Sequence, residues 1–209
     1  MTGLPEHVTI REVALRDGLQ IEAPIPLSAK LELLAAIAAT GVREVEATAF
    51  VSPSKVPALA DAPDLAAALS DYPDIEFSAL VASPNGAKRA IAAGLRSLEY
   101  VVSAADGHSR ANVGRSSAEA TAQIGEIVAI AHDSGVSVEV IIAPAWDCPF
   151  APGASGNIAT EDLVYLLRDS GIAVDVDLSA AIDAARVAQS VVGHELPSAL
   201  LRAGDRMRD

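Results

Sequence analysis

The sequence predicts an α/β fold with about five parallel strands followed by C-terminal helices. In the first two-thirds of the 209 residues, short runs rich in β-branched residues alternate with segments of helical period. This alternation is typical of a parallel sheet whose strands are joined by right-handed helical crossovers. After Trp146 the alternation stops, a loop rich in Gly, Pro and Ala follows, and two further helices are expected.

Five segments are predicted to form the strands, because each is short, apolar and bounded by turn residues. They are Val8–Leu15, Glu44–Phe50, Ile75–Ala82, Ser97–Ala104 and Ser137–Ala145. A chain of this length suits a single domain with an easily buried core. Five strands are too few for a closed barrel of parallel strands, which has eight and typically about 250 residues.

Helices are predicted where an N-cap residue or a proline precedes a segment of helical period and a glycine ends it. The expected helices run from Ser28 to Gly41, from Pro84 to near Gly94, from Ser116 to Gly135, from Thr160 onward, and from Leu178 to Val192 before Gly193. In the third of these, Ser116 and Glu119 fit a capping box.

The composition excludes several classes of protein. A net charge of −13 argues against binding of nucleic acid and of anionic membrane surfaces, both of which need clustered Lys and Arg. The single cysteine excludes an internal disulfide framework and suits a reducing, cytoplasmic location. The first residues, MTGLPEHVTI, lack the apolar segment of a signal peptide. No apolar run approaches the ~20 residues of a membrane span.

Arg16, Asp17 and Gly18 lie at the end of the first predicted strand, within VTIREVALRDGLQIE. Functional residues of strand-then-helix proteins are found where the strands end. An aspartate there can bind a hard cation, and an adjacent arginine can neutralise a developing oxyanion. From these three residues alone, a surface turn with an Arg/Asp pair is about equally well supported.

Three longer motifs resemble the 3-hydroxy-3-methylglutaryl-CoA (HMG-CoA) lyase family. They are LRDGLQIE, EVEATAFVSPSKVPALADA from Glu44 to Ala62, and CPFAPGASGNIATEDLVYLL from Cys148 to Leu167. The resemblance covers most of the chain and implies a metal-dependent TIM barrel that makes or breaks carbon–carbon bonds beside a thioester or keto acid. Leu19 and Gln20 favour the lyases over the related synthases. The expected fold is therefore an incomplete TIM barrel.

The resemblance also implies a reaction and a set of site residues. HMG-CoA would be cleaved to acetyl-CoA and acetoacetate with Mg²⁺ or Mn²⁺ as cofactor. Matching the motifs residue by residue gives Arg16, Glu46 and Cys148 as catalytic residues, Asp17 and Asn157 as metal ligands, and Arg16, Gln20 and Arg110 as groups that bind the acyl-CoA substrate.

Each of these residues also has a structural interpretation. Asp17 could be a turn or capping acid, and Asn157 after a glycine is a common turn residue. Glu46 lies in an apolar strand, where an unpaired carboxylate is costly. An ion pair with Arg16 or Arg43 is therefore expected, and a purely structural role is as well supported as catalysis. Cys148 could be a buried thiol.

The segment from Ala104 to Ser116 is interpreted as a solvated polar loop. By resemblance it is the family's substrate-side loop, in which Arg110 and Arg115 would meet the phosphates of CoA. Since the whole chain is strongly acidic, an anionic thioester would need such a local basic region.

Two departures from the family suggest an internal deletion. The family has a Cys-Pro-aromatic sequence after strand five and again after strand eight, whereas this chain has one, Cys148-Pro149-Phe150. We infer that strands six to eight are missing, which leaves one truncated domain made of residues 1–147, with five βα units, and 148–209, with the terminal loop and helices. The family's His-x-His metal ligands are also missing. The four histidines are His7, His108, His132 and His194.

These departures predict severely reduced or absent activity for this chain. An open sheet would expose an apolar face and unpaired edges, which favours aggregation or a homodimer that covers the gap. Two alternatives to an HMG-CoA lyase stay open. One is a related lyase or synthase acting on another acyl-CoA, and the other is a non-catalytic remnant or interaction module.

Overall fold

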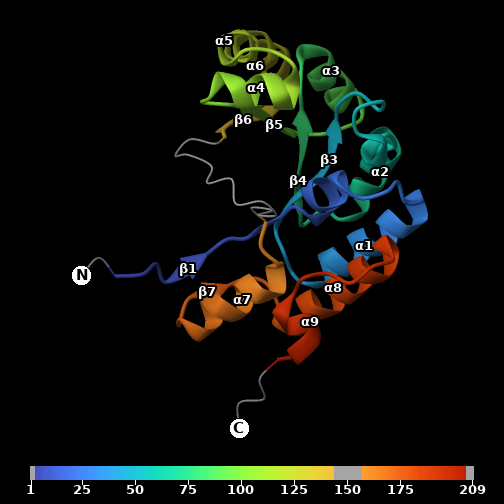
Figure 1. Ribbon diagram of the computed structural model, residues 1–209, viewed down its shortest axis with the longest axis vertical. Coiled ribbons are helices and arrows are strands. Elements are labelled where there is room, and N and C mark those ends of the chain that lie inside the picture. Colours follow the sequence, from blue (N-terminus) through green and yellow to red (C-terminus); the bar gives the residue numbers. More distant parts are fainter. Residues whose placement is uncertain (1–2, 144–156, 206–209) are drawn as a thin grey trace.

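Five parallel strands form a curled sheet that makes up half of a barrel. The structure is a computed structural model and describes residues 3–143 and 157–205. The strand order is β2-β3-β4-β5-β6, with the helices outside the curl (Figure 1). The strands are β2 (Arg11–Glu12), β3 (Glu44–Phe50), β4 (Glu76–Val81), β5 (Ser97–Val102) and β6 (Ser137–Ile142). The predicted incomplete TIM barrel of about five parallel strands is confirmed.

Helices connect the strands and form the C-terminal part of the chain. They are α1 (Leu27–Ala39), α2 (Ala62–Ala68), α3 (Pro84–Ala92), α4 (Asp106–Val113), α5 (Ser117–Ala122), α6 (Ile124–Asp133), α7 (Thr160–Asp169), α8 (Leu178–Val192) and α9 (Ala199–Ala203), with 3-10 turns η2 (Pro57–Leu59) and η3 (Leu69–Asp71). Within residues 3–143 and 157–205, no helix has the length and apolar character that crossing a membrane requires.

The C-terminal part of the chain lies beside the first βα unit. Strand β1 (His7–Val8) pairs in parallel with β7 (Ala173–Val174) as a separate two-stranded sheet. Helix α8 packs along α1 (Figure 1). The segment that follows β6 in the sequence therefore returns to the opposite edge of the five-stranded sheet.

The core is an apolar layer between the sheet and its helices. On β3, residues 45–50 are all buried, with apolar Val45, Ala47 and Ala49 alternating with other side chains, and on α1 the buried residues include Leu34 and Ile37. Alternation along a strand sends the intervening side chains to the other face. The inner face of the half-barrel thus receives polar side chains, which build the site described below.

The predicted first strand, Val8–Leu15, is wrong in extent. Strands β1 and β2 are two residues each, and Ala14–Gly18 forms a single π-helical turn, η1. The carbonyl of Val13 accepts hydrogen bonds from the backbone N–H groups of Arg16, Asp17 and Gly18 at 3.1, 2.7 and 3.2 Å. Local hydrogen bonding here outweighs the β propensity of the apolar run, so Arg16 and Asp17 lie in a turn after the strand.

Two predicted N-caps are also wrong. Helix α1 is preceded by Pro26 with no side-chain cap, so Ser28 lies inside the helix. Helix α7 is preceded by Ala159, and the Thr160 hydroxyl instead donates to the Glu12 carboxylate at 2.6 Å. The predicted strand Glu44–Phe50 is confirmed without change, and the next two differ by one or two residues at their ends. The last predicted strand begins at Ser137 as expected, and its Pro144 and Ala145 lie outside the described residues.

The capping box at Ser116 and Glu119 is confirmed, as are helix α8 and its stop at Gly193, where φ is 77°. The helix expected from Ser116 to Gly135 is divided into α5 and α6 at Gln123. The segment 104–116, expected to be a loop, contains the two turns of α4. The division of the domain between 147 and 148 falls outside the described residues and stays a prediction.

Candidate functional site

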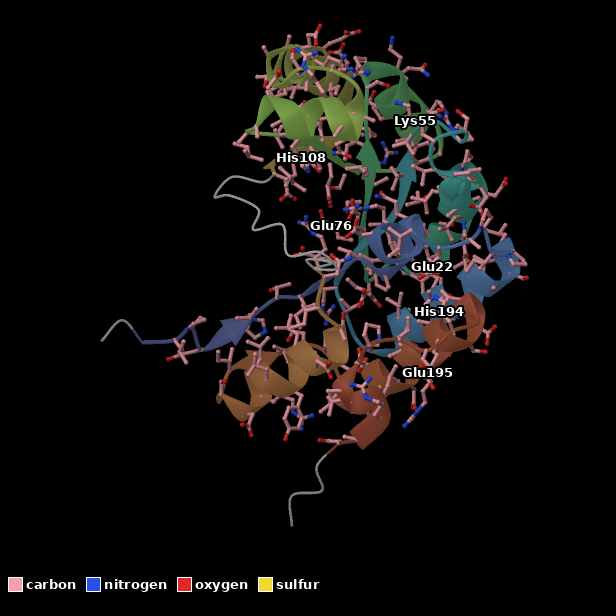
Figure 2. The ribbon with its side chains drawn as sticks, in the orientation of Figure 1. Glu22, Lys55, Glu76, His108, His194 and Glu195 are labelled. Atoms are coloured by element: carbon pink, nitrogen blue, oxygen red, sulfur yellow. The ribbon has the colours of Figure 1, made fainter. Side chains whose placement is uncertain are left out.

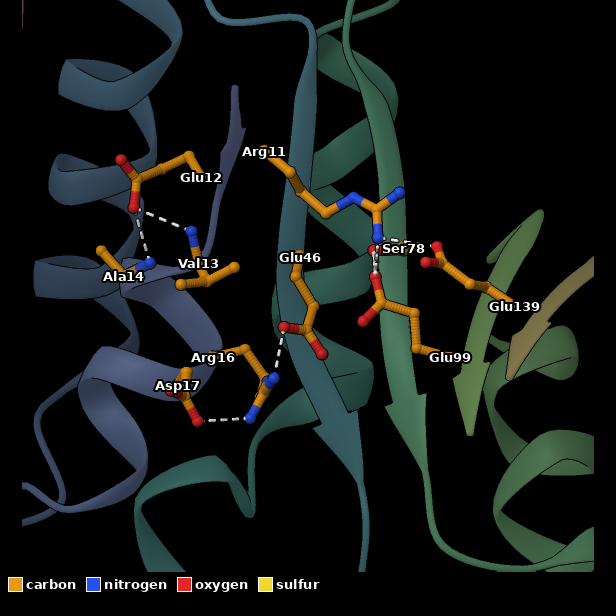
Figure 3. A network of polar contacts seen from close by, with 10 residues as sticks. All are labelled: Arg11, Glu12, Val13, Ala14, Arg16, Asp17, Glu46, Ser78, Glu99 and Glu139. Atoms are coloured by element: carbon orange, nitrogen blue, oxygen red, sulfur yellow. Dashed lines mark hydrogen bonds and ion pairs between the residues drawn. The ribbon is translucent and has the colours of Figure 1, made fainter. Parts of the chain in front are cut away.

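Arg16 joins two carboxylates at the inner face of the half-barrel. Its Nη2 lies 2.6 Å from Oε2 of Glu46, and its Nη1 lies 2.5 Å from Oδ1 of Asp17 (Figure 3). Glu46 comes from the middle of β3, whereas Arg16 and Asp17 come from η1 directly after β2. The expected ion pair of Glu46 is thus formed with Arg16. Three of the predicted site residues are brought together.

Glu12 holds the turn that carries Arg16 and Asp17. Its Oε1 accepts from the backbone N–H groups of Val13 and Ala14 at 2.8 and 2.7 Å, while its Oε2 accepts from the Thr160 hydroxyl. One carboxylate therefore caps η1 and ties it to the start of α7. Sequence reasoning missed this residue. The available signal was an acidic residue directly before a helical turn, where its side chain can accept from backbone N–H groups. The start of this turn was instead predicted to be part of a strand.

Burial raises the pKa of Glu46 to about 7, and the nearby Glu99 carboxylate adds to the rise, although Arg16 acts in the opposite direction. Glu46 is 1% exposed, and among the described residues its Oε1 has no hydrogen-bond partner. A carboxyl group that titrates near neutral pH, with one oxygen free, is able to take and return a proton. The arrangement suits general acid–base chemistry.

A second arginine supports the neighbouring carboxylates. Nη1 of Arg11 lies 3.2 Å from Oε1 of Glu99 and 2.7 Å from Oε2 of Glu139, and its Nε lies 3.2 Å from Oε2 of Glu44. Ser78 also donates to Glu99 at 2.6 Å (Figure 3). Glu46 and Glu99, the buried glutamates of this cluster, therefore each have their own arginine. Arg11 also links β2 to β6, the two outermost strands of the sheet, and sequence reasoning missed it.

The remaining predicted site residues lie apart from this cluster or are not described. Gln20 is exposed after η1, and Arg110 is exposed on α4, where its Nε lies 2.9 Å from Oδ2 of Asp106. Asn157 is exposed three residues before the start of α7. Cys148 lies outside the described residues.

Arg115 contacts the chain at the end of a strand. Its Nη1 donates to the carbonyl of Ala82, directly after β4, at 3.2 Å, and to Oε1 of Gln123 at 2.9 Å. It is thereby held at the C-terminal side of the sheet, the side on which η1 also lies. Its role in binding CoA stays a prediction.

The four histidines are engaged elsewhere. His7 lies 3.2 Å from Asp175, His108 shares a hydrogen bond with Ser103, His132 is exposed on α6, and His194 lies 2.9 Å from Glu22. Figure 2 shows His108 near α4 and His194 beside Glu22, in separate parts of the molecule.

The described part of the chain does not offer a full set of metal ligands. Across residues 3–143 and 157–205, no three His, Cys, Asp or Glu side chains come together in a way that could hold a metal ion. Asp17 is engaged with Arg16 as well. These residues therefore do not fit a tightly held metal centre.

Residues 7–151 match the model of the HMGL-like family. The chain belongs to this family. Among curated relatives, the cytoplasmic HMG-CoA lyase of Rattus norvegicus is 32% identical over 162 residues, covering 77% of this chain and 47% of the relative. The chain thus spans about half the length of that protein. The (R)-citramalyl-CoA lyase of Chloroflexus aurantiacus is 28% identical over 303 residues, covering 95% of each protein.

Solved structures of HMG-CoA lyases share the fold. The Acinetobacter baumannii enzyme, solved in complex with coenzyme A and 3-methylmalate, has a TM-score of 0.80 and 26% identity and covers 98% of this chain and 97% of that one. The Pseudomonas aeruginosa enzyme has a TM-score of 0.87 at 22% identity, and the match covers 96% of this chain and 98% of that one. The expected relationship to the HMG-CoA lyases is confirmed.

Proposed function

We propose that this chain is a carbon–carbon lyase that cleaves HMG-CoA to acetyl-CoA and acetoacetate, with strongly reduced turnover. The observation that carries the proposal is the buried pair of Arg16 and Glu46, with the pKa of Glu46 raised to about 7 by burial. Membership of the HMGL-like family and the names of the relatives support the substrate class. An acyl-CoA is therefore the proposed partner, and the acidity of the chain disfavours nucleic acid.

The two residues have complementary roles in this reaction. The Glu46 carboxylate takes the proton of the tertiary hydroxyl, and the carbon–oxygen bond becomes the ketone of acetoacetate as the adjacent carbon–carbon bond breaks. The electron pair of that bond passes to the thioester fragment as an enolate, whose charge the Arg16 guanidinium stabilises. Returning the proton to the enolate carbon gives acetyl-CoA and restores the carboxylate.

Mg²⁺ or Mn²⁺ is the proposed cofactor, with Asp17 and Asn157 as its ligands. The hydroxyl of Thr160 is bonded to Glu12, and Asn157 is three residues away along the chain, a reach of at most about 10 Å. This supports a position of Asn157 near η1. Two oxygen ligands without a histidine pair would bind the ion weakly, which is why we propose slow turnover.

We further propose that the chain is one truncated barrel lacking strands six to eight. In a closed barrel the last βα unit packs against the first. Here β7 pairs with β1 and α8 packs along α1, which supports the loss of internal units. The alignment to the citramalyl-CoA lyase extends over 303 residues although this chain has 209, so it contains gaps. Sequencing the genomic locus tests the proposal, which fails if the intervening units are encoded there.

The activity is tested by a coupled assay of acetyl-CoA release from HMG-CoA. Purified chain is assayed with Mn²⁺, with EDTA, as Asp17→Ala, and as Asp133→Ala, which removes an exposed acid of α6 as a matched control. We expect slow, metal-dependent release that Asp17→Ala abolishes and Asp133→Ala leaves unchanged. No release from protein shown to be folded would overturn the proposal and favour a non-catalytic remnant or interaction module.

Cleavage of (R)-citramalyl-CoA is the second candidate function. The observation that favours it is the alignment to a lyase of that name at 28% identity over 95% of both proteins, against 25% identity for the Bacillus subtilis HMG-CoA lyase, which aligns over 93% of this chain and 96% of that protein. Assaying the two thioesters side by side separates these candidates.

A further inference from the structure

Strand β6 is an open edge of the sheet. The backbone N–H of Ser137 donates to the carbonyl of Arg96 at 3.0 Å, and that of Ala143 donates to the carbonyl of Val102 at 2.8 Å. Because backbone direction alternates along a strand, the N–H and C=O groups of the residues between these inward-facing ones point away from β5. The outward-facing residues are Val138, Val140 and Ile142. No strand among the described residues pairs with them.

This edge carries few of the features that usually protect an open strand, its one charged residue being Glu139. It is six residues long and has no proline, lysine or bulge. Val140 and Ile142 are 37% and 59% exposed. The opposite edge strand, β2, is only two residues long, and the neighbouring β1 is paired with β7. Of the two edges, β6 is thus the one able to accept another strand.

The charge of the edge permits a second copy to approach. The whole chain carries −13, so most of its surface repels another copy. The only charged residue of β6 is Glu139, and its carboxylate turns toward the inside of the half-barrel, 2.7 Å from Arg11. The outward edge is therefore an uncharged, apolar strip on an acidic protein.

We propose that two copies of this chain pair through β6, antiparallel and related by a two-fold axis at Val140. In this register Val140 lies opposite Val140 of the partner subunit, and Val138 lies opposite Ile142 of the partner subunit. Outward N–H and C=O groups then meet in pairs, and β-branched side chains pack across the axis. The two half-barrels become one continuous sheet.

An axis at Val140 pairs all three outward-facing residues with one another, and the charged residue excludes the neighbouring register on one side. Moving the axis by one residue, to position 139, would place the two Glu139 residues directly opposite each other, and like charges in opposed positions destabilise a strand pair. With the axis at Val140, Glu139 instead lies opposite Ile141 of the partner subunit.

Cysteine cross-linking tests the register. In a Cys148→Ser background, which removes the only native cysteine, Val140→Cys and Ile142→Cys are each oxidised at increasing protein concentration. Opposed residues in antiparallel strands lie about 5.5 Å apart between Cα atoms, within the range for a disulfide. Residues 142 of the two copies would be about 14 Å apart, since they are offset by four residues at ~3.4 Å each. We expect a covalent dimer for Val140→Cys only; a dimer for Ile142→Cys alone, or none, overturns the register.

Analytical ultracentrifugation tests the interface itself. Val140→Lys places two ammonium groups at the axis, whereas Val128→Lys adds the same charge at an equally exposed valine on α6, 43% exposed against 37%. We expect the wild-type chain and Val128→Lys to dimerise alike, and Val140→Lys to raise the dimer dissociation constant about tenfold or more. A monomeric wild-type chain, or equal effects of both variants, overturns the proposal. Should Val140→Lys fail to fold by circular dichroism, the milder Val140→Cys cross-link still decides.

Discussion

Replacing Glu46 by glutamine should change how the stability of the protein depends on pH. A carboxyl group ordinarily titrates near 4.5, and burial raises the pKa of Glu46 to about 7. The folded state therefore keeps this proton over a pH range in which the unfolded state has lost it. Stability from this group is fully present below about pH 4.5 and is lost as the pH rises through 7.

The size of the effect follows from the separation of these two values. One pKa unit corresponds to about 1.4 kcal/mol, so the loss between pH 5 and pH 8 is on the order of 3 kcal/mol. For a domain of this size, that lowers the melting temperature by roughly 6 to 12 °C. The glutamine of Glu46→Gln cannot ionise, so this variant does not lose stability in this way as the pH rises. Its melting temperature should therefore fall much less than that of the wild-type chain.

The measurement is thermal unfolding of both proteins at pH 5, 6, 7 and 8. Glu126→Gln, on the exposed face of α6, serves as the control and should follow the wild-type curve. The comparison removes contributions from other groups such as Glu161, the pKa of which is also raised by burial. Parallel curves for the wild-type chain and Glu46→Gln would refute the reasoning, because a group that titrates alike in both states contributes no pH dependence.

Two further predictions concern the polar contacts inside the half-barrel. Arg11→Met leaves buried Glu99 without its cation, although Ser78 still donates to it, and should lower the free energy of unfolding by about 1 to 3 kcal/mol in urea titration. Arg186→Met removes an exposed pair on α8 and should change the free energy of unfolding by less than about 1 kcal/mol. Similar losses in the two variants would contradict the prediction for Arg11→Met. Glu12→Ala removes the partner of two backbone N–H groups and of the Thr160 hydroxyl and should cost about 1 to 3 kcal/mol, together with most of any lyase turnover. An unchanged melting temperature would show that η1 does not depend on this carboxylate.

Much of the fold and part of the site could be predicted from the sequence. Alternation of strand and helix signals predicted the parallel sheet, and the Ser116 capping box and the Gly193 helix stop were correct because each depends only on neighbouring residues. The cost of burying a charge predicted that Glu46 would have an arginine partner. The prediction of a strand through Leu15 was wrong because the carbonyl of Val13 and the carboxylate of Glu12 accept hydrogen bonds from nearby backbone N–H groups. The β propensities of the residues carry no information about such local hydrogen bonds.

The family, the α/β class and the residue types available for chemistry could be predicted without a structure, since these depend on motifs, periodicity and composition. Which of those residues contact one another depends on how the chain folds in three dimensions. Arg11 reaches Glu139 across 128 residues because the sheet curls, and Thr160 bonds to Glu12 because the C-terminal segment returns to the first unit. The rise in the pKa of Glu46 likewise results from packing, because burial and the nearness of Glu99 depend on how distant strands are placed around it.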